Sequence, residues 1–313
     1  MPAPLSLGAG FHFGWWDALR NPISVPSGKM VRPAFALQSA QAVNDSAADS
    51  AMHVAVAVEL VHNFSLVHDD VIDADERRHG RPTVWAQFGV PYAIILGDAL
   101  LALASQALVR GGEPGTAAMC DELNQAVLDL CLGQHLDISF EELAAVSADE
   151  YLEMAGGKTS SLLAAACVLG GLAGDATSAQ LTALRSFGHH VGLAFQLVDD
   201  LLGIWGDPVL TGKPVGGDLR RYKKSMPVIA ALSSGTPEGV ELAHLYQTRS
   251  IVDQRQVARA AALADRAGAR EWTEAQAAKH HRFAIESLHG MDGNPAAIAR
   301  LDALADLVIR RDS

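Results

Sequence analysis

Apolar residues recur along this chain at the three- and four-residue spacing of helices that bury one face. The alternation of apolar and polar residues that marks strands is scarce. The pattern predicts an all-α protein with helices over residues 54–68, 92–109, 119–132, 151–172, 179–204 and 257–287. Ser147 and Glu150 fit a capping box ahead of the fourth helix. Glycine and proline separate the helices at residues 111–115, 206–208, 216–217 and 293–295.

The predicted helices form a single domain over residues 1–313, because no repeat, low-complexity linker or change of composition marks a boundary. Alanine and leucine are abundant and 49% of the residues are hydrophobic, which favours helices around a sizeable core. Several helices are apolar nearly all round, as in the core of a bundle or in a subunit interface.

Charge and cysteine content narrow the class of protein further. A formal net charge of -12 argues against nucleic acid as a partner, because phosphate backbones bind to clustered positive charge. The three cysteines lack metal-ligand spacing and indicate free thiols in a reducing compartment. No basic segment followed by an apolar one opens the chain. Asp98 interrupts the apolar run over 92–109, so no membrane span is expected. We therefore expect a cytoplasmic protein.

A first acidic cluster follows the apolar helix over 54–68. Asp69, Asp70 and Asp73 lie in it, with Asp69 and Asp73 on one helix face about 6 Å apart along the axis. Two carboxylates at that spacing repel each other unless a cation lies between them. Hard oxygen ligands suit Mg²⁺, which also bridges to substrate phosphates. The alternative is a solvated acidic helix end, which the apolar helix leading into the cluster disfavours.

A second acidic pair, Asp199 and Asp200, lies inside an apolar helix over 193–205. Aspartates are rarely buried without a partner, so the pair predicts either metal ligands or structural ion pairs. Two acidic pairs on apolar helices of a bundle are able to clamp metal ions between them. The cations that two diphosphates would need are also present. They are Lys29, Arg32, Arg77, Arg78, Lys158, Lys213, Lys223 and Lys224.

These motifs resemble, from about residue 28 to 227, the trans-isoprenyl diphosphate synthases, or polyprenyl synthetases. ELVHNFSLVHDDVID at 59–73 resembles the first aspartate-rich motif, with an arginine tail at 77–80. GQHLD at 133–137 resembles the GQxxD element, and GKT at 157–159 the lysine-threonine motif. FQLVDD at 195–200 resembles the second aspartate-rich motif. TGK at 211–213 and DLRRYKKSMP at 218–227 resemble the loop that follows it.

The resemblance implies a helical bundle of the isoprenoid synthase type around a central cavity, usually in a homodimer. It implies a Mg²⁺-dependent prenyltransferase that joins isopentenyl diphosphate to an allylic diphosphate. Metal ions and cationic side chains would stabilise the leaving diphosphate, and an apolar cavity would shelter the allylic cation. The family assigns the released proton to the departing diphosphate, so no protein base is named.

The resemblance also implies a role for each matching residue. The Mg²⁺ ligands would be Asp69, Asp73 and Asp199, supported by Asp70, Asp137 and Asp200. The allylic diphosphate would be held or faced by Arg77, Lys158, Lys213 and Gln196. Isopentenyl diphosphate would be held by Lys29, Arg32, His62 and Arg78. Thr159 and Gln196 would turn oxygens towards the cation, and Lys223 would close over the metal and diphosphate.

Some positions depart from the family pattern. Gly203 stands where the second motif usually has its third aspartate, which predicts weaker support for a metal ion but no loss of activity. Ser27 replaces a frequent glycine, Met30 a frequent arginine and Tyr222 a usual glycine. These three departures affect only the expected details of the loops.

Product length in this family follows the depth of the cavity below the first motif. On an ideal helix Ser65 and Val61 lie one and two turns below Asp69, and their modest size would leave a deep cavity. Phe64 lies about 140° away on the helical wheel, so geometry alone does not make it the floor. By resemblance, an aromatic residue there favours a C20 product, geranylgeranyl diphosphate, with C15 farnesyl diphosphate second and longer chains third.

Two other functions remain as alternatives. A class I terpene cyclase would share the first motif, but Asp199 and Asp200 with Lys213 and Lys223 speak against it. A non-catalytic subunit of a heteromeric synthase would tend to lose acidic motifs, and only Gly203 favours that interpretation.

Overall fold

The computed structural model describes residues 1–23, 30–113, 115–206 and 216–309, and it confirms the predicted all-α class. Contacts group these residues into two compact units. The first contains Met1–Gln125, Ala165–Leu181 and Asp292–Leu301, and the second contains Ala126–Ala164, Thr182–Met291 and Asp302–Ser313. The single domain over 1–313 stays a prediction.

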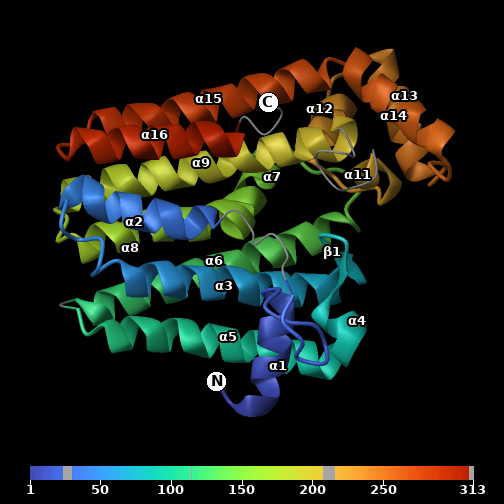
Figure 1. The fold of residues 1–313 in the computed structure, drawn as a ribbon. Coiled ribbons are helices and arrows are strands. Elements are labelled where there is room, and N and C mark those ends of the chain that lie inside the picture. Colours follow the sequence, from blue (N-terminus) through green and yellow to red (C-terminus); the bar gives the residue numbers. More distant parts are fainter. Residues whose placement is uncertain (24–29, 114, 207–215, 310–313) are drawn as a thin grey trace. The chain divides into compact units, whose positions relative to one another are not determined.

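The first unit contains most of the N-terminal half of the chain (Figure 1). Its elements are α1 (Ala3–His12), α2 (Val31–Val43), α3 (Met52–Ile72), the strands β1 (Arg77–Arg78) and β2 (Arg81–Pro82), α4 (Val84–Phe88) and α5 (Val90–Gly111). The start of α6 (Thr116–Phe140), the end of α8 (Ser161–Ala173) and the starts of α9 (Ser178–Trp205) and α16 (Pro295–Ile309) complete it.

Helices α3 and α5 lie side by side in this unit (Figure 1). Gly97 permits the close approach, because a Cβ atom there would collide with the imidazole ring of His68. The buried side of α3 carries Val54, Val58, Val61 and Val67. This packing fixes the direction of α3, and therefore the place of the aspartates at its C-terminal end.

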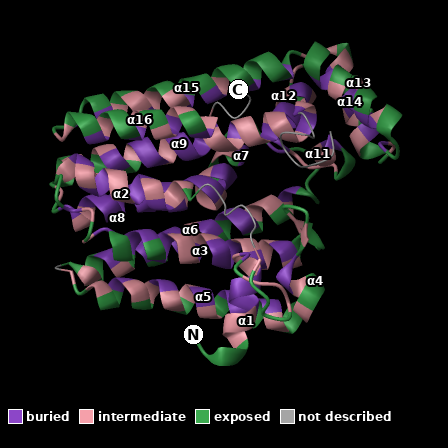
Figure 2. Ribbon diagram, viewed as in Figure 1, coloured by how far each residue is buried: buried purple, intermediate pink, exposed green. Residues whose placement is uncertain are grey.

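Helix α5 is, within the described part of the chain, the one helix long and apolar enough to cross a membrane. Its inner face packs on α3, where Leu96 and Leu100 are buried. Its outer face carries the exposed side chains of Ile95, Asp98 and Val109, and Figure 2 shows exposed residues along the helix. An acidic residue on the outer face is atypical of a lipid-facing surface.

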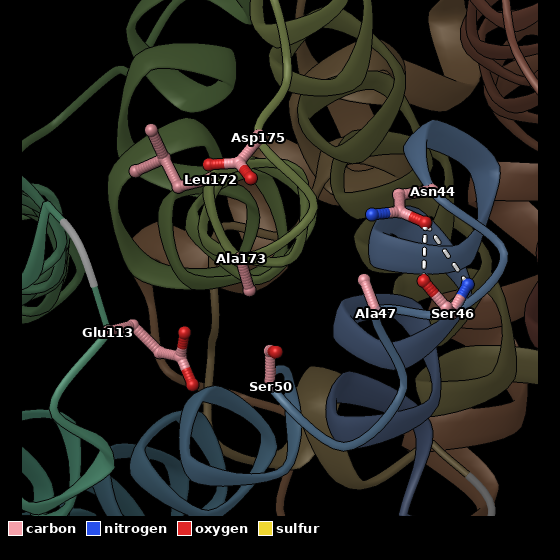
Figure 3. A pocket seen from close by; sticks show the side chains of 8 residues that line it. All are labelled: Asn44, Ser46, Ala47, Ser50, Glu113, Leu172, Ala173 and Asp175. Atoms are coloured by element: carbon pink, nitrogen blue, oxygen red, sulfur yellow. Dashed lines mark hydrogen bonds between the residues drawn. The ribbon is translucent and has the colours of Figure 1, made fainter.

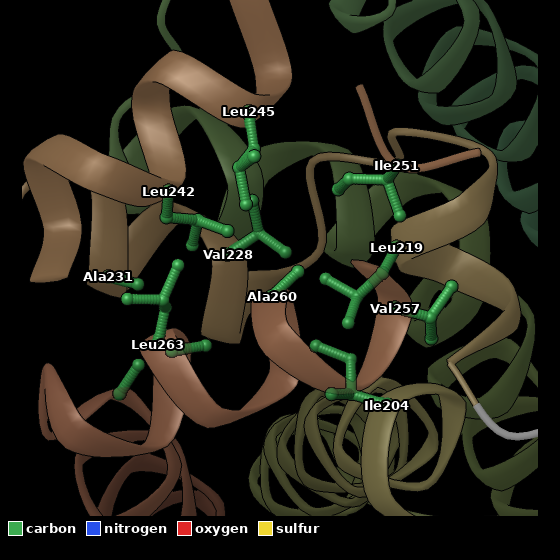
Figure 4. Packing of buried hydrophobic residues seen from close by; sticks show 12 residues of the cluster. Ile204, Leu219, Val228, Ala231, Leu242, Leu245, Ile251, Val257, Ala260 and Leu263 are labelled. Carbon is green, nitrogen blue, oxygen red and sulfur yellow. The ribbon is translucent and has the colours of Figure 1, made fainter. Parts of the chain in front are cut away.

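The second unit contains the remaining elements. They are the rest of α6, α7 (Ala148–Ala155), the π-helical turn η1 (Gly156–Ser160), the start of α8, most of α9, α11 (Gly217–Arg220), α12 (Met226–Leu232), α13 (Pro237–Gln247), α14 (Gln254–Arg266), α15 (Ala269–His289) and the end of α16. Its apolar core includes a cluster to which α9, α11, α12, α13 and α14 all contribute (Figure 4).

Two predicted helices are interrupted in the structure. The helix expected over 151–172 consists of α7, η1 and α8 in succession, because five residues wind as a π-helix. The helix expected over 257–287 is divided into α14 and α15 at Gly268, whose φ of 77° lies in the left-handed region that ends helices. The capping box of Ser147 and Glu150 is confirmed at the start of α7.

Candidate active site

The first acidic cluster occupies the C-terminal end of α3, in the first unit. Asp69 is half-buried, Asp70 is buried and Asp73 is exposed as the residue that ends the helix. Carboxylates are unfavourable at the negative end of a helix dipole, and a bound cation there is favourable. The electrostatics of this helix end therefore suit a metal ion.

Asp70 differs from its neighbours because it is paired with an arginine. Its Oδ1 accepts a hydrogen bond from Nε of Arg78 at 2.8 Å, and Nη2 of the same guanidinium forms an ion pair with it at 2.8 Å. Burial raises the pKa of the Asp70 carboxyl group, and Arg78 opposes that rise. Its Oδ2 is buried and has no hydrogen-bond partner among the described residues. Asp70 thus orients Arg78 and keeps one buried oxygen available.

The arginine tail lies on a short hairpin. Arg78 pairs with Arg81 and Arg77 with Pro82 across strands β1 and β2. The guanidinium of Arg77 donates to the carbonyl of Gly80 at the turn. The hairpin presents the two predicted diphosphate ligands on a fixed backbone just beyond the acidic cluster.

Arg32 of α2 and His62 of α3 lie together in the same unit. Nη1 of Arg32 is 3.3 Å from Nε2 of His62, which therefore accepts a hydrogen bond as a neutral imidazole. Burial, and then the charges of Arg32 and Arg78, place the pKa of His62 well below its usual range. The structure thus brings together three of the four residues predicted to bind isopentenyl diphosphate. The fourth, Lys29, lies outside the described residues.

His12 of α1 joins this group, and the sequence analysis did not single it out. Its Nε2 is 2.9 Å from Oδ1 of Asn63, whose amide donates to Oε1 of Glu59 at 2.9 Å. Burial is the largest influence and lowers the pKa of His12 to about 4, although the bond to Asn63 opposes it. The signal in the sequence was Asn63 itself, a polar amide within an apolar stretch of α3 that requires a partner.

In the second unit the π-helical turn carries Lys158 and Thr159. It packs closely on α6, because a Cβ atom on Gly157 would stand 2.7 Å from the carbonyl oxygen of Asp129. Single π-helical turns often mark functional sites. The Lys158 ammonium donates to Oδ2 of Asp137 on α6. The positive charge of Lys158 and the negative charge of Asp137 therefore partly neutralise each other.

The lysine-threonine motif is joined to α9 by a chain of hydrogen bonds. Thr159 Oγ1 donates to Oε1 of Gln196 at 2.7 Å, and Nε2 of Gln196 donates to Oδ1 of Asp200 at 3.0 Å. The amide orientation of Gln196 is fixed by this network. The oxygens of Thr159 and Gln196, which were predicted to face the allylic cation, are therefore held in contact within this unit.

Asp200 is fully buried and organises three elements. Its Oδ2 accepts hydrogen bonds from the hydroxyl of Tyr151 on α7 and from the backbone N–H of Met226, at 2.8 Å, on α12. Burial raises the pKa of Asp200 to about 6, although the charge of Lys223 opposes it. Asp200 thus positions α7, α9 and α12, whereas its neighbour Asp199 is half-buried.

Lys223 lies among carboxylates. Burial alone would lower its pKa, but the charges of Asp137, Asp200, Asp218 and Asp199 raise it above its usual range. Tyr222, just before it, has a φ of 56°. This left-handed backbone is one that glycine adopts more readily than tyrosine. Lys213 lies outside the described residues.

The residues predicted to set product length lie on α3. Val61, Phe64 and Ser65 are all buried. The ring of Phe64 packs edge-on against the ring of His68, with centroids 4.9 Å apart. The hydroxyl of Ser65 donates to the carbonyl of His62 one turn earlier. The side chains on which product length would depend are therefore part of the packed interior of this unit.

A polar cavity of about 200 Å³ lies in the first unit (Figure 3). Its lining includes Asn44, Ser50, Glu113 and Asp175. Ser50 precedes the start of α3, whereas Asp69 and Asp73 lie at its end, about 30 Å away for a helix of this length. The cavity is therefore not where the acidic motif lies.

Residues 15–264 match the model of the polyprenyl synthetase family. The chain belongs to this family. It is 45% identical over its whole length to the geranylgeranyl diphosphate synthase of Mycobacterium tuberculosis and covers 88% of that protein. It is 42% identical, over 97% of its length and 85% of the relative, to the (2E,6E)-farnesyl diphosphate synthase of the same species.

The fold agrees with solved structures of this family. The polyprenyl synthetase from Streptomyces coelicolor A3(2) superposes with a TM-score of 0.94 at 44% identity, covering 99% of this chain and 93% of the other. The geranylgeranyl pyrophosphate synthase from Corynebacterium glutamicum, complexed with isoprenyl diphosphate and magnesium, gives a TM-score of 0.87 at 27% identity, covering 99% and 92%. The predicted isoprenoid synthase fold is confirmed, and the protein is a short-chain isoprenyl diphosphate synthase, a trans-prenyltransferase.

Side chains of this polyprenyl synthetase fit the Mg²⁺ that the family implies. The donors are hard carboxylate oxygens, and Oδ2 of Asp70 is buried without a partner among the described residues. No group of three or more His, Cys, Asp or Glu side chains within the described ranges is gathered closely enough to hold a metal ion by itself.

Proposed function

We propose that this synthase uses Mg²⁺ to condense isopentenyl diphosphate with allylic diphosphates up to geranylgeranyl diphosphate, the C20 product. The observation that supports this product length is that Phe64 is buried beside the modest side chains of Ser65 and Val61, below Asp69 on α3. The geranylgeranyl diphosphate synthase among its relatives supports the same length. Farnesyl diphosphate, the C15 product, is the second candidate, because the farnesyl diphosphate synthase is nearly as similar.

The first unit would bind isopentenyl diphosphate and metal. Arg32, Arg78 and neutral His62 would donate to isopentenyl diphosphate, together with Lys29. Asp69 and Asp73 would hold Mg²⁺, and Arg77 would contact the allylic diphosphate. The pairing of Arg78 with Asp70 supports this assignment, because it fixes a guanidinium whose planar shape suits phosphate oxygens.

The second unit would hold the leaving diphosphate and shelter the cation. Asp199 would bind metal, while Lys158, Lys213 and Lys223 would bind diphosphate oxygens. Mg²⁺, when bound, would neutralise charge on the leaving group. The lone pairs of Thr159 and Gln196, held together by their hydrogen bond, would face the allylic cation. Asp137 and Asp200 would position Lys158 and Gln196.

The test is an incubation of the purified protein with Mg²⁺, isopentenyl diphosphate and each of the C5, C10 and C15 allylic diphosphates, with products sized by mass spectrometry. We expect C20 to be the longest diphosphate from every starter. A longest product of C15 would select the second candidate. Absence of elongation from all three starters would reject the proposed function, and release of a hydrocarbon would indicate a cyclase.

We further propose that the synthase is a cytoplasmic homodimer. The outer face of α5 supports the dimer, because its apolar side chains Ile95 and Val109 are 54% and 61% exposed, with the exposed Asp98 on the same face. A second copy of the chain would cover this row, which Ala102 continues midway. The three free cysteines, Cys120, Cys131 and Cys167, support a reducing compartment.

A further inference from the structure

The side-chain amide of Asn63 has one fixed orientation in the interior of α3. Its Nδ2 donates to the backbone carbonyl and to Oε1 of Glu59, at 2.8 and 2.9 Å, and its Oδ1 lies 2.9 Å from Nε2 of His12. A flipped amide would set its oxygen against the two oxygens of Glu59, so Oδ1 is the acceptor. His12 therefore carries its proton on Nε2 and donates it to Asn63.

This network of His12, Asn63 and Glu59 extends to an arginine of the candidate site. Burial raises the pKa of Glu59, and the bond from Asn63 and then the charge of Arg32 oppose that rise. The Glu59 carboxylate is therefore within electrostatic reach of the Arg32 guanidinium. Arg32 in turn contacts His62, which lies one turn beyond Glu59 on the same face of α3. The network thus ends at two of the residues predicted to hold isopentenyl diphosphate.

A histidine suits the position of His12 because it donates a hydrogen bond without adding charge. Burial is the largest influence and lowers the pKa of His12 to about 4, and the charges of Arg78 and Arg81 act in the same direction. The ring is therefore neutral at pH 7. A lysine or arginine there would repel the two arginines, which lie on the hairpin beyond α3.

Helix α1 is attached to its neighbours by contacts other than that of His12. Near its start, the hydroxyl of Tyr92 on α5 donates to the carbonyl of Pro4 at 2.7 Å. Near its end, the guanidinium of Arg81 donates to the carbonyl of Phe11 and lies over the ring of that residue. The bond from His12 to α3 is thus an addition to the docking of the helix, and it is directed at the face that carries the network.

We propose that His12 is a positioning residue for the site that would bind isopentenyl diphosphate. It fixes the amide of Asn63, the amide fixes the carboxylate of Glu59, and the carboxylate restrains the guanidinium of Arg32. The N-terminal helix thereby contributes to the affinity for one of the two substrates. This inference rests on the proposed function and deepens it.

The first experiment removes the donor and then restores it. His12→Phe keeps a ring of similar size but leaves the buried Oδ1 of Asn63 without its donor, so the KM for isopentenyl diphosphate should rise roughly 5- to 10-fold. The allylic KM and kcat should stay within about twofold of the wild type. His12→Gln supplies an uncharged N–H donor and should recover most of the lost affinity. An unchanged KM for isopentenyl diphosphate in His12→Phe, with folding verified by thermal melting, would overturn the proposal.

A matched variant separates positioning from the mere attachment of α1. Tyr92→Phe removes the hydroxyl that holds the start of the helix, which lies away from the network. It should lower the melting temperature and leave the KM for isopentenyl diphosphate unchanged. If Tyr92→Phe raises that KM as much as His12→Phe does, the effect comes from a loosened helix, and His12 does not position the site.

A double-mutant cycle tests the route through Glu59. Glu59→Gln should raise the KM for isopentenyl diphosphate by itself, and adding His12→Phe should then change it little, because both variants interrupt the same network. Fully additive effects would show that His12 and Glu59 act independently, and the proposed route would be wrong.

Failure of this inference is distinguishable from failure of the function on which it rests. A wild type that elongates, with an unchanged KM in His12→Phe, would reject only the inference. A wild type that elongates no allylic diphosphate would reject the proposed function. Calorimetric titration with isopentenyl diphosphate then tests the inference without turnover, and equal affinity of His12→Phe and the wild type would overturn it.

Discussion

Nε of Arg78 donates a hydrogen bond to Oδ1 of Asp70 at 2.8 Å, and Nη2 of the same guanidinium is ion-paired with that oxygen at 2.8 Å. The consequence is that a buried carboxylate at the end of α3 fixes the orientation of Arg78 on the hairpin beyond it, the arginine that we propose binds isopentenyl diphosphate. The acidic motif and its arginine tail are therefore in direct contact in the structure as well as neighbours in sequence.

Removal of the Asp70 charge tests this coupling. Asp70→Asn should raise the KM for isopentenyl diphosphate about tenfold, since hydrogen bonds to charged groups contribute about 1.5–3 kcal/mol and the amide oxygen is still able to accept a weaker, neutral hydrogen bond from Arg78. The KM for the allylic diphosphate should change less. Steady-state kinetics with each substrate varied in turn give both constants. Glu76→Gln, an exposed neighbour, is the matched control. A larger effect on the allylic KM would contradict the assignment of Arg78.

Product length should respond to the side chains below Asp69. Ser65→Phe places an aromatic ring one turn below the motif, so the longest product should shorten to C15. Phe64→Ala should lengthen it beyond C20, with a loss of about 3–5 kcal/mol in the free energy of unfolding from the deleted ring. Mass spectrometry of the products measures the length, and thermal melting confirms that each variant folds. Unchanged product length in both variants would remove these positions from the determinants.

The sequence predicted this site best where a local pattern determines the geometry. The spacing of Asp69 and Asp73 on an apolar helix, and the capping box of Ser147 and Glu150, both follow from helical periodicity. The π-helical turn at 156–160 did not, because a switch from i+4 to i+5 hydrogen bonding leaves the apolar pattern nearly unchanged. His12 was missed for a second reason. It reaches its place through a tertiary contact with Asn63, far along the chain, which no spacing records.

The outer face of α5 gives a prediction about assembly. Ile95→Asp places a charge in the exposed apolar row and should convert the dimer to a monomer, because an unpaired charge at the centre of an interface is costly to bury. Light scattering coupled to gel filtration measures the mass directly. Val240→Asp makes the same change at an exposed position of α13 and should leave the mass unchanged. A monomeric wild type would reject the dimer.

A histidine pair should make stability depend on pH. Nδ1 of His190 on α9 lies 3.1 Å from Nδ1 of His280 on α15, an arrangement that requires at least one neutral ring. Burial, and then the neighbouring His189 and His280, lower the pKa of His190 to about 4. Burial, and then Lys279 and His189, also lower that of His280.

Because the folded-state pKa values lie below those of the unfolded chain, the unfolded state binds more protons between about pH 6.5 and 4. The free energy of unfolding should therefore fall as the pH is lowered through that window, and His280→Gln should reduce the fall by on the order of 1 kcal/mol after allowance for solvent screening. Urea denaturation at pH 7.5 and pH 5 measures it. His244→Gln, at an exposed position on α13, should behave as the wild type. Equal pH dependence in His280→Gln and the wild type would show that the pair does not titrate as proposed.

Tyr222, the residue just before Lys223, has an unfavourable backbone conformation that its side-chain contacts stabilise. Its φ of 56° favours glycine, yet its hydroxyl accepts a hydrogen bond from the N–H of Ile251 at 2.7 Å and its ring packs edge-on against Tyr246, with centroids 5.4 Å apart. Tyr222→Gly would relieve about 1–2 kcal/mol of backbone strain but lose these contacts, so we expect a net loss of stability and a lower kcat, because Lys223 would be less firmly placed. Tyr222→Phe keeps the ring and should lose only the hydrogen bond, about 1–3 kcal/mol. Thermal melting and steady-state kinetics of the two variants separate the contributions. If Tyr222→Gly is as stable and as active as the wild type, relief of backbone strain outweighs the contacts, and the tyrosine does not position Lys223.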